Sequence, residues 1–162
     1  MIDLDKIRLV IVGGLKGALG APVIRSNTVA PLPKLPFCSY TISDLLENSG
    51  GTWAQYEDGT DRIPAKQIWS ITVNAEDYGS CTKLALTAHD FFSKSGVELL
   101  KKAGIVVENV GAIKARDTVL TVDYEYRQGF DVRLGVMNEM PNTKQGIDGV
   151  EINGKMLETG GD

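Results

Sequence analysis

The side chains in this sequence that could carry nucleophilic chemistry are one histidine, His89, and two cysteines, Cys38 and Cys81. A thiolate activated by a neighbouring imidazole is a common catalytic nucleophile, so His89 with either cysteine is the first arrangement to consider. However, Cys81 falls on the apolar stripe of a predicted helix, and His89 falls at the border of that stripe. We therefore predict that both thiols are reduced and buried, and that His89 is a structural ring at the edge of the core.

Metal chemistry has little support, because one histidine and no C-x-x-C or H-x-x-x-H spacing leave too few ligands for zinc. The acidic group of Glu57, Asp58 and Asp61 lacks the regular ligand ladder of a calcium loop. Asp123 and Glu125 alternate along a predicted strand and share one face, which suits a solvated sheet face as well as a catalytic pair. The sequence therefore predicts no catalytic residue, no cofactor and no metal ion.

A glycine-rich segment with Gly13, Gly14 and Gly17 follows an apolar run and resembles a nucleotide-binding turn. Counted from Gly13, the G-x-G-x-x-G pattern of such a turn requires glycines where this chain has Leu15 and Ala18. A proline-containing extended stretch follows, whereas a dinucleotide site needs a helix there. We interpret the segment as part of a glycine-containing helix. A small nucleotide-binding enzyme that uses the segment is kept as an alternative.

Composition places the chain among ordinary globular domains. It has 162 residues, a formal net charge of −4 and 43% hydrophobic residues, which is enough for a single domain with its own core. Mild acidity without a basic run argues against a surface that holds nucleic acid tightly. The longest apolar run, residues 9–12, is too short to cross a membrane. The acidic start of the chain also differs from a secretion signal.

The elements that must position these residues begin with a helix over residues 4–19, where apolar side chains recur at helical spacing. Gly20 and Pro22 favour its end. Residues 23–37 are predicted to be extended, because prolines recur along them and exclude a helix. Extended backbone has polar groups that need partners, and docking of this stretch on a neighbouring subunit is one way to satisfy them.

The rest of the chain predicts strands around a central pair of helices. The first of these helices has Cys81 and Phe92 on its apolar stripe and Asp77 or Ser80 as its cap, and the second covers residues 96–102. A long loop, or a hairpin turning at Asp58-Gly59, covers residues 47–62. Strands are predicted over residues 37–45, 66–74, 105–113, 119–126 and 130–137, with a possible short one over 150–152. This order predicts a single α+β domain whose mostly antiparallel β-sheet is flanked by an N-terminal helix and a central helix pair.

Trp53 and Tyr56 lie in the polar 47–62 segment, where a core does not require aromatic side chains. Aromatic residues in such places often anchor interfaces, although a loop tryptophan can also fold back on its own domain. Both readings stay open at this point.

The order of several short segments resembles the phage neck or tail terminator proteins of tailed bacteriophages. The residues that carry the resemblance are Pro22-Val23-Ile24-Arg25-Ser26-Asn27, the proline-rich Pro31 to Phe37, the strand Gln67–Asn74 running into Asp77-Tyr78, Gly96 to Ile105, Tyr124 to Val132, and Val150 to Gly154. Together they span nearly the whole chain, and their order and spacing are more specific than any one of them. We take residues 1–154 as a terminator-like domain and residues 155–162 as a flexible C-terminal tail.

The resemblance implies a non-enzymatic virion protein of the tail or neck, assembled in the host cytoplasm. Such proteins form a ring, commonly a hexamer, that caps the tail tube, ends its growth and joins the head-completion (connector) proteins around the DNA channel. The partners implied are therefore further copies of the chain, the tail tube protein and the head-completion proteins. DNA passes through without tight binding, and no membrane is involved. Another ring of the same apparatus, a tail tube or head-completion protein, is the first alternative.

Candidate site residues follow from this reading. We predict that six residues contact a neighbouring subunit or partner, namely Arg25, Pro31, Pro33, Pro36, Trp53 and Tyr56. Four acidic residues are predicted to face the channel or the partner ring, namely Glu57, Asp58, Asp61 and Glu139. An acidic lining suits a lumen through which DNA slides, since it repels phosphate.

Overall fold

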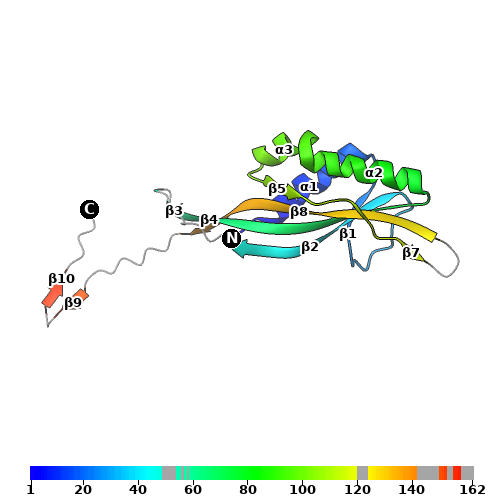
Figure 1. Ribbon diagram of the computed structural model, residues 1–162. Helices are drawn as coiled ribbons and strands as arrows, with labels where there is room; N and C mark the ends of the chain where they lie inside the picture. Colours follow the sequence, from blue (N-terminus) through cyan, green and yellow to red (C-terminus); the bar gives the residue numbers. More distant parts are fainter. Residues whose placement is uncertain are drawn as a thin grey trace.

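The computed structural model describes residues 1–48, 54–55, 57, 59–119, 124–141, 150–152 and 155–157. Figure 1 shows the helices on one face of a long, twisted β-sheet. The elements in chain order are α1 (Leu4–Leu19), β1 (Val23–Arg25), β2 (Phe37–Asn48), β3 (Ala54–Gln55), β4 (Thr60–Ala75), α2 (Tyr78–Asp90), the π-helical turn η1 (Phe91–Ser95), α3 (Val97–Lys102), β5 (Val106–Val110), β6 (Lys114–Ala115), β7 (Thr118–Val119), β8 (Tyr124–Pro141), β9 (Val150–Ile152) and β10 (Lys155–Leu157).

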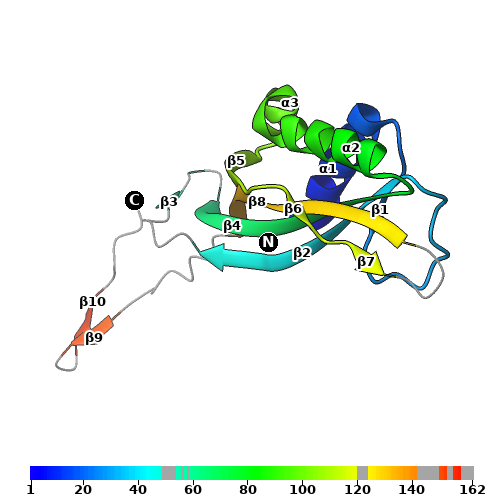
Figure 2. The ribbon, with the colours of Figure 1, turned by 45° about the vertical axis from the view of Figure 1, so that its right-hand side comes forward.

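The main sheet has the strand order β1-β2-β4-β8-β5. Only β1 and β2 run parallel in this order, and the other neighbours are antiparallel. The short strands β6 and β7 pair with β8 beyond β5, as Figure 2 shows, and β3 pairs with the start of β4. The fold is thus α+β with a mostly antiparallel sheet, an N-terminal helix and a central helix pair, which confirms the predicted class.

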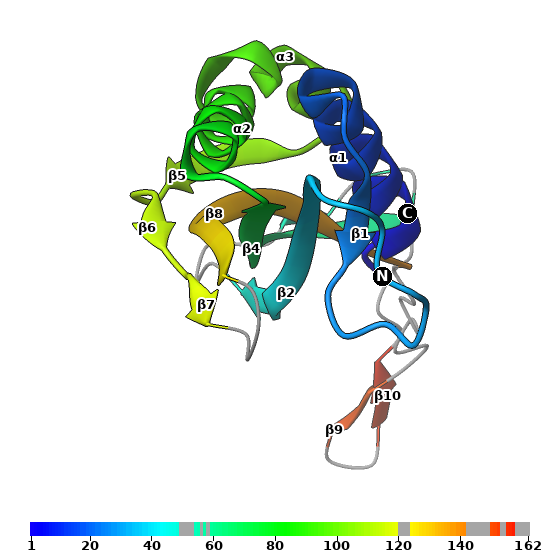
Figure 3. The same cartoon turned by 90° about the vertical axis from the view of Figure 1, so that its right-hand side faces the viewer.

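The core lies between the helix layer and one face of the sheet (Figure 3). Alternate residues of β4 and β8 face the helices because successive side chains of a strand point to opposite faces. Trp69 and Ile71 of β4 and Phe130 of β8 are buried there, against Ile11 and Leu15 of α1. Burying each of these side chains stabilises the fold by about 1.5–3 kcal/mol.

Capping residues set the helix boundaries. Asp3 accepts a hydrogen bond from the backbone N–H of Lys6 at 3.0 Å, and Gly20 ends α1 in the left-handed conformation with φ 62°. Glycine adopts that conformation without the steric cost that a Cβ would add. Asp77 caps α2 by accepting from the N–H of Ser80 at 2.8 Å. The predicted bounds of the first helix are confirmed.

The predicted strands over residues 119–126 and 130–137 are corrected by the structure. Residues 124–141 form one strand, β8, which pairs with β4 from Ala75↔Tyr126 to Thr60↔Pro141. Gly129 does not interrupt it: a Cβ there would lie 2.4 Å from the backbone oxygen of Ile71, so glycine permits the close approach of the two strands. The predicted strand over 105–113 is also shorter, and β5 ends at Val110.

The pairing of β3 with β4 agrees with a hairpin in the 47–62 segment, although Asp58 of the predicted turn lies outside the described residues. Strands β9 and β10 form a separate antiparallel pair. The predicted domain boundary after residue 154 falls between these two strands and stays a prediction. Among the described residues, no helix combines the length and the hydrophobicity that a membrane crossing requires.

Candidate functional site

The side chain of His89 is held at the edge of the core by contacts on both ring nitrogens. Its Nε2 lies 3.0 Å from the carbonyl oxygen of Gly111, to which it donates, and its Nδ1 lies 3.3 Å from the hydroxyl of Ser93. The ring also packs edge-on against Phe130, with 5.1 Å between the ring centroids. This geometry agrees with the structural role predicted for His89.

The two cysteines are free thiols that are buried on different elements, Cys38 on β2 and Cys81 on α2. Burial raises the pKa of the Cys38 thiol to about 12, and burial also raises the pKa of Cys81. The Cys81 Sγ donates to the backbone oxygens of Tyr126 and Val73, at 3.4 Å and 3.5 Å. Since the thiolate is the reactive form, both side chains are inert at neutral pH.

The glycine-rich segment lies within α1, where its backbone amides belong to the helix. A phosphate loop needs amides that point freely at the ligand, so this segment does not form one. Gly14 has a packing role instead, because a Cβ there would lie 2.6 Å from Cζ of Phe91. In the part of the chain that the structure describes, no group of three or more His, Cys, Asp or Glu side chains is placed to hold a metal ion.

Four predicted interface residues lie on or beside the loop that joins β1 to β2. We call residues 26–36 the arm; it descends beside the sheet on the side away from the helices (Figure 3). Arg25, Pro31 and Pro36 are exposed and Pro33 is half-buried. The arm also presents two apolar side chains to solvent, Val29 with a relative exposure of 108% and Leu32 with 71%. Trp53 and Tyr56 lie outside the residues whose side chains the structure describes.

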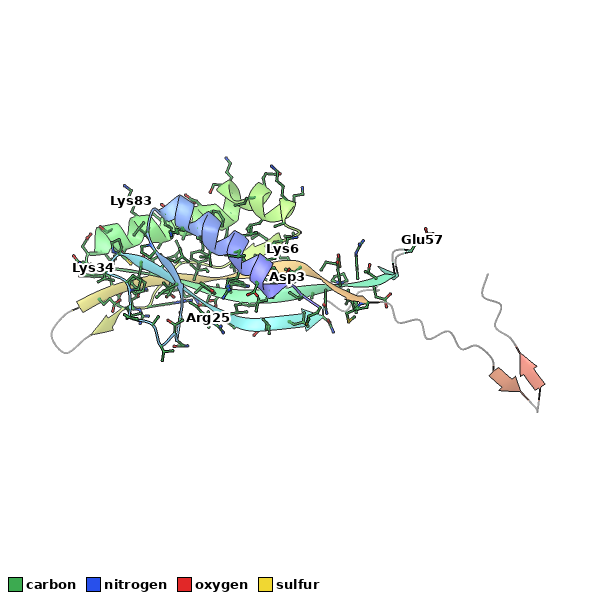
Figure 4. The ribbon with its side chains drawn as sticks, turned by 180° about the vertical axis from the view of Figure 1, so that it is seen from behind. Asp3, Lys6, Arg25, Lys34, Glu57 and Lys83 are labelled. Atoms are coloured by element: carbon green, nitrogen blue, oxygen red, sulfur yellow. The ribbon has the colours of Figure 1, made fainter. Side chains whose placement is uncertain are left out.

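Three of the four predicted acidic residues gather at one end of the sheet. Glu57 is exposed and lies beyond the start of β4 (Figure 4). Asp61 lies in β4, and Glu139 lies near the end of β8. The Glu139 carboxylate accepts from Nε of Arg62 at 3.1 Å, so its charge is partly compensated. Asp58 lies outside the described residues.

An apolar groove, which the sequence did not predict, lies close to that end of the sheet, beside the start of α1. Its volume is about 670 Å³, and it is lined by Met1, Ile2, Leu4, Leu45, Leu46, Gln67, Asn138, Met140 and Pro141. This volume is within the range of about 300–1,000 Å³ that is usual for ligand sites. We refer to it below as the groove.

Within the described part of the chain, two buried polar atoms in the groove have no hydrogen-bond partner. The side chain of Gln67 is fully buried, and its Oε1 accepts from Nε1 of Trp69 at 3.0 Å, which orients its Nε2 donor elsewhere. Neither that Nε2 nor the Oδ1 of Asn138 has a hydrogen-bond partner among the residues that the structure describes. Buried donors and acceptors are rarely left unpaired in folded proteins, so a molecule in the groove, either water or a polar group of a ligand, is expected to complete this pair.

The edge of the sheet beside the groove is also open. β1 pairs with β2 only from Cys38 to Tyr40, so within the described ranges Thr41–Asn48 has no strand on that side. Register shifts relative to β4 follow Ile42 and Asp44, and these bulges let the neighbours Leu45 and Leu46 both reach the groove. An open edge presents unpaired backbone groups to which another extended chain can add.

The face of the sheet away from the helices carries a polar network that sequence patterns did not reveal. Arg116 donates to the hydroxyls of Ser70 at 2.7 Å and Thr72 at 2.9 Å, and pairs with Asp131 at 3.2 Å. Because Ser70, Thr72 and Asp131 alternate with core residues, the sequence places them on a solvated face of the sheet. No local sequence pattern indicated that Arg116 contacts them. The sequence feature that could have indicated the groove is Gln67, a polar residue that alternates together with Trp69 and Ile71 and so lies on the buried face of the strand.

Residues 5–160 match a protein-family model that is described as phage neck terminator protein. No curated protein matches the chain.

Proposed function

Because the chain belongs to the phage neck terminator proteins, a family of structural proteins, we propose that copies of it close into a ring, commonly a hexamer, that caps the tail tube of a tailed bacteriophage. The ring ends growth of the tube on one face and joins the head-completion proteins on the other. DNA passes through its centre without tight binding, and assembly takes place in the host cytoplasm.

The family match carries this proposal, since it covers residues 5–160 of the 162 in the chain. The shape of the subunit supports it. A closed ring is built from head-to-tail contacts, in which two different surfaces of each copy meet. The arm and the groove supply two such surfaces on different parts of the sheet.

The acidic character of the chain supports the proposal that DNA passes through the ring without tight binding. The chain has a net charge of −4, and DNA phosphates are repelled by acidic side chains. We propose that the end of the sheet with Glu57, Asp61 and Glu139 faces the channel or the neighbouring ring. Asp58 belongs to the same proposal by its position in the sequence.

Removing the gene for this chain from its phage tests the proposed role. We expect heads and tails that remain separate and tail tubes longer than those of the parent phage, because nothing stops tube growth. Electron microscopy of lysates measures both, and supplying the intact chain from a plasmid restores joined particles of normal length. Tails of normal length attached to filled heads in the absence of the chain would contradict the proposal.

A further inference from the structure

We propose that the arm of one copy binds to the next copy as an added edge strand beside Thr41–Asn48 of β2, with Leu32 inserted in the groove. This inference rests on the proposed ring and identifies the two surfaces that hold neighbouring copies together.

The groove has the chemistry of a site for an extended peptide. Its walls are largely apolar, yet they carry a donor, Nε2 of Gln67, and an acceptor, Oδ1 of Asn138, for which the described ranges supply no partner. A peptide backbone supplies a carbonyl oxygen for the first and an N–H for the second. An apolar side chain on the same segment fills the space between the leucines and the start of α1.

The open edge of β2 supplies the remaining backbone contacts. The open edge Thr41–Asn48 includes Leu45 and Leu46, which line the groove, so one extended segment can pair with the edge and also fill the groove. Addition of a strand to an open edge is a common mode of peptide recognition, in which the main chain gives affinity and side-chain pockets give specificity.

Residues 31–33 of the arm lie between bends and have a sequence that is compatible with an added edge strand. Prolines cannot donate a backbone hydrogen bond, and Pro31 and Pro33 stand two residues apart, so in an extended strand both face the same side. If that side faces solvent, the N–H groups of Ala30 and Leu32 face β2. The exposed side chains of Val29 and Leu32 are apolar, so a partner that covers them buries apolar surface that the isolated subunit leaves in water.

The arm cannot fill the groove of its own subunit. Leu32 is separated from Phe37, where β2 begins, by five residue steps, which span at most about 17 Å. Leu46 lies nine residue steps beyond Phe37 along β2, which is roughly 30 Å at the usual rise of a strand. Figure 4 shows the same separation, with Lys34 of the arm toward one end of the sheet and Glu57 at the other. An arm that fills the groove must therefore come from a second copy, in the head-to-tail contact that a closed ring requires.

Disulfide trapping of the full chain tests this contact. The variant carries Leu32→Cys in the arm and Leu46→Cys in the groove, and both native cysteines are buried. Particles assembled with this variant, and the purified chain over a range of concentrations, are oxidised and run on denaturing gels without reductant. We expect a ladder of covalent multimers that collapses to the monomer when reductant is added.

The matched control combines Leu32→Cys with Leu86→Cys. Leu86 lies on α2, and its relative exposure of 51% is close to the 48% of Leu46. A ladder in particles with the groove variant but not with the control supports the proposal. Absence of the ladder in particles, or an equal ladder in both variants, overturns it.

A charge variant separates this inference from the proposed function. Leu32→Asp places a carboxylate on an exposed position, so the subunit still folds, but the carboxylate cannot enter the apolar groove. We expect at least a tenfold loss of joined particles, with partial recovery when Leu46→Lys is added. If heads and tails join normally with Leu32→Asp, and the Leu32→Cys, Leu46→Cys variant gives no ladder, the groove assignment fails while the terminator role stands. If deletion of the chain leaves joined particles of normal length, the terminator role itself fails.

Discussion

The ring of Phe91 packs closely against two glycines that come from different parts of the chain. A Cβ on Gly14 of α1 would lie 2.6 Å from the phenyl ring, and a Cβ on Gly96 would lie 2.4 Å from it. Both distances are far below an ordinary carbon contact, so the ring fills the space that a side chain would need. The glycines that resemble a nucleotide loop in the sequence thus include one that serves helix packing.

Gly14→Ala tests this packing role. Overpacking against Phe91 costs about 1–3 kcal/mol, which outweighs the gain of about 1 kcal/mol in helix propensity. We expect a net loss of free energy of unfolding, measured by urea denaturation. The control is Gly13→Ala, because nothing lies within 4 Å of a Cβ at that position. The control gains about 0.5–1 kcal/mol from helix propensity alone. Equal effects of the two substitutions would contradict the packing role.

Burial of Cys38 gives the fold a dependence on alkaline pH. Burial raises the pKa of the thiol from an ordinary 9.0 to about 12, so the folded state keeps a proton that the unfolded chain releases. The stabilisation is therefore fully present below pH 9 and is lost as the pH rises toward 12.

We expect the free energy of unfolding to fall between pH 8 and pH 11 more steeply for the native chain than for Cys38→Ala. Urea unfolding at several pH values measures both slopes. Other groups titrate in this range in both proteins, so only the difference between the slopes reports Cys38. Parallel slopes would show that the thiol ionises as easily in the folded state as in the unfolded chain.

At the scale of elements, α2 depends on a cap that lies outside the core. The Asp77 carboxylate accepts from the backbone N–H and from the hydroxyl of Ser80, each at 2.8 Å. Acceptance of these hydrogen bonds, the backbone one first, lowers the pKa of Asp77 below its ordinary 3.8. The stabilisation that it provides is present above that pH and is lost as the pH falls through the lower folded value.

Asp77→Ala is expected to lower the Tm of the protein by a few degrees at pH 7, because an orphan N–H at the start of the helix loses its partner. Asp77→Asn is the control, since asparagine caps a helix about as well as aspartate. Thermal unfolding followed by circular dichroism measures both. A Tm for Asp77→Ala equal to that of the native chain would contradict the capping role.

Pro64 shows how the sheet accommodates a residue that strands usually exclude. It lies in β4 opposite Met137 of β8, but the pairing of β4 with β2 ends at Ala65. Proline has no N–H to donate, so it suits a position where β4 has one long neighbouring strand, β8, and not two. The end of the sheet near the groove is therefore narrower than its centre.

At the scale of the whole molecule, the two ends of the sheet differ in chemistry. One end carries the arm with exposed Val29 and Leu32, and the other carries Glu57, Asp61 and Glu139 near the groove. This polarity is what a subunit needs if its neighbours bind head to tail and one region faces the channel.

Reversing charge at the acidic end tests the proposed orientation. Glu57→Lys combined with Glu139→Lys is expected to slow or stall DNA passage, because lysines hold phosphates that acids repel. Infectivity and the amount of DNA left in adsorbed particles measure this effect. The control, Asp90→Lys with Glu98→Lys, makes the same change in net charge at exposed positions of the helix layer. Unchanged infectivity of the first variant, in particles that contain it, would contradict the orientation.

Several features of this protein were determined by the sequence alone, because they depend on residues close together in the chain. The bounds of α1 follow from its apolar spacing and Gly20, and the burial of Trp69, Ile71 and Val73 follows from alternation along one strand. The α+β class follows from the order of these elements. The resemblance to terminator proteins, which rests on the order of short segments, is confirmed by the family match.

The tertiary structure alone decided how distant segments meet. The long pairing of β4 with β8 makes one strand of residues 124–141, although local patterns predicted two. Gln67, Leu46 and Asn138 line one groove only because β2, β4 and β8 lie side by side and α1 begins beside them. Strand pairing joins residues far apart in the chain through backbone groups that every residue has, so the alternation within one strand shows which face is buried but not which strand lies beside it.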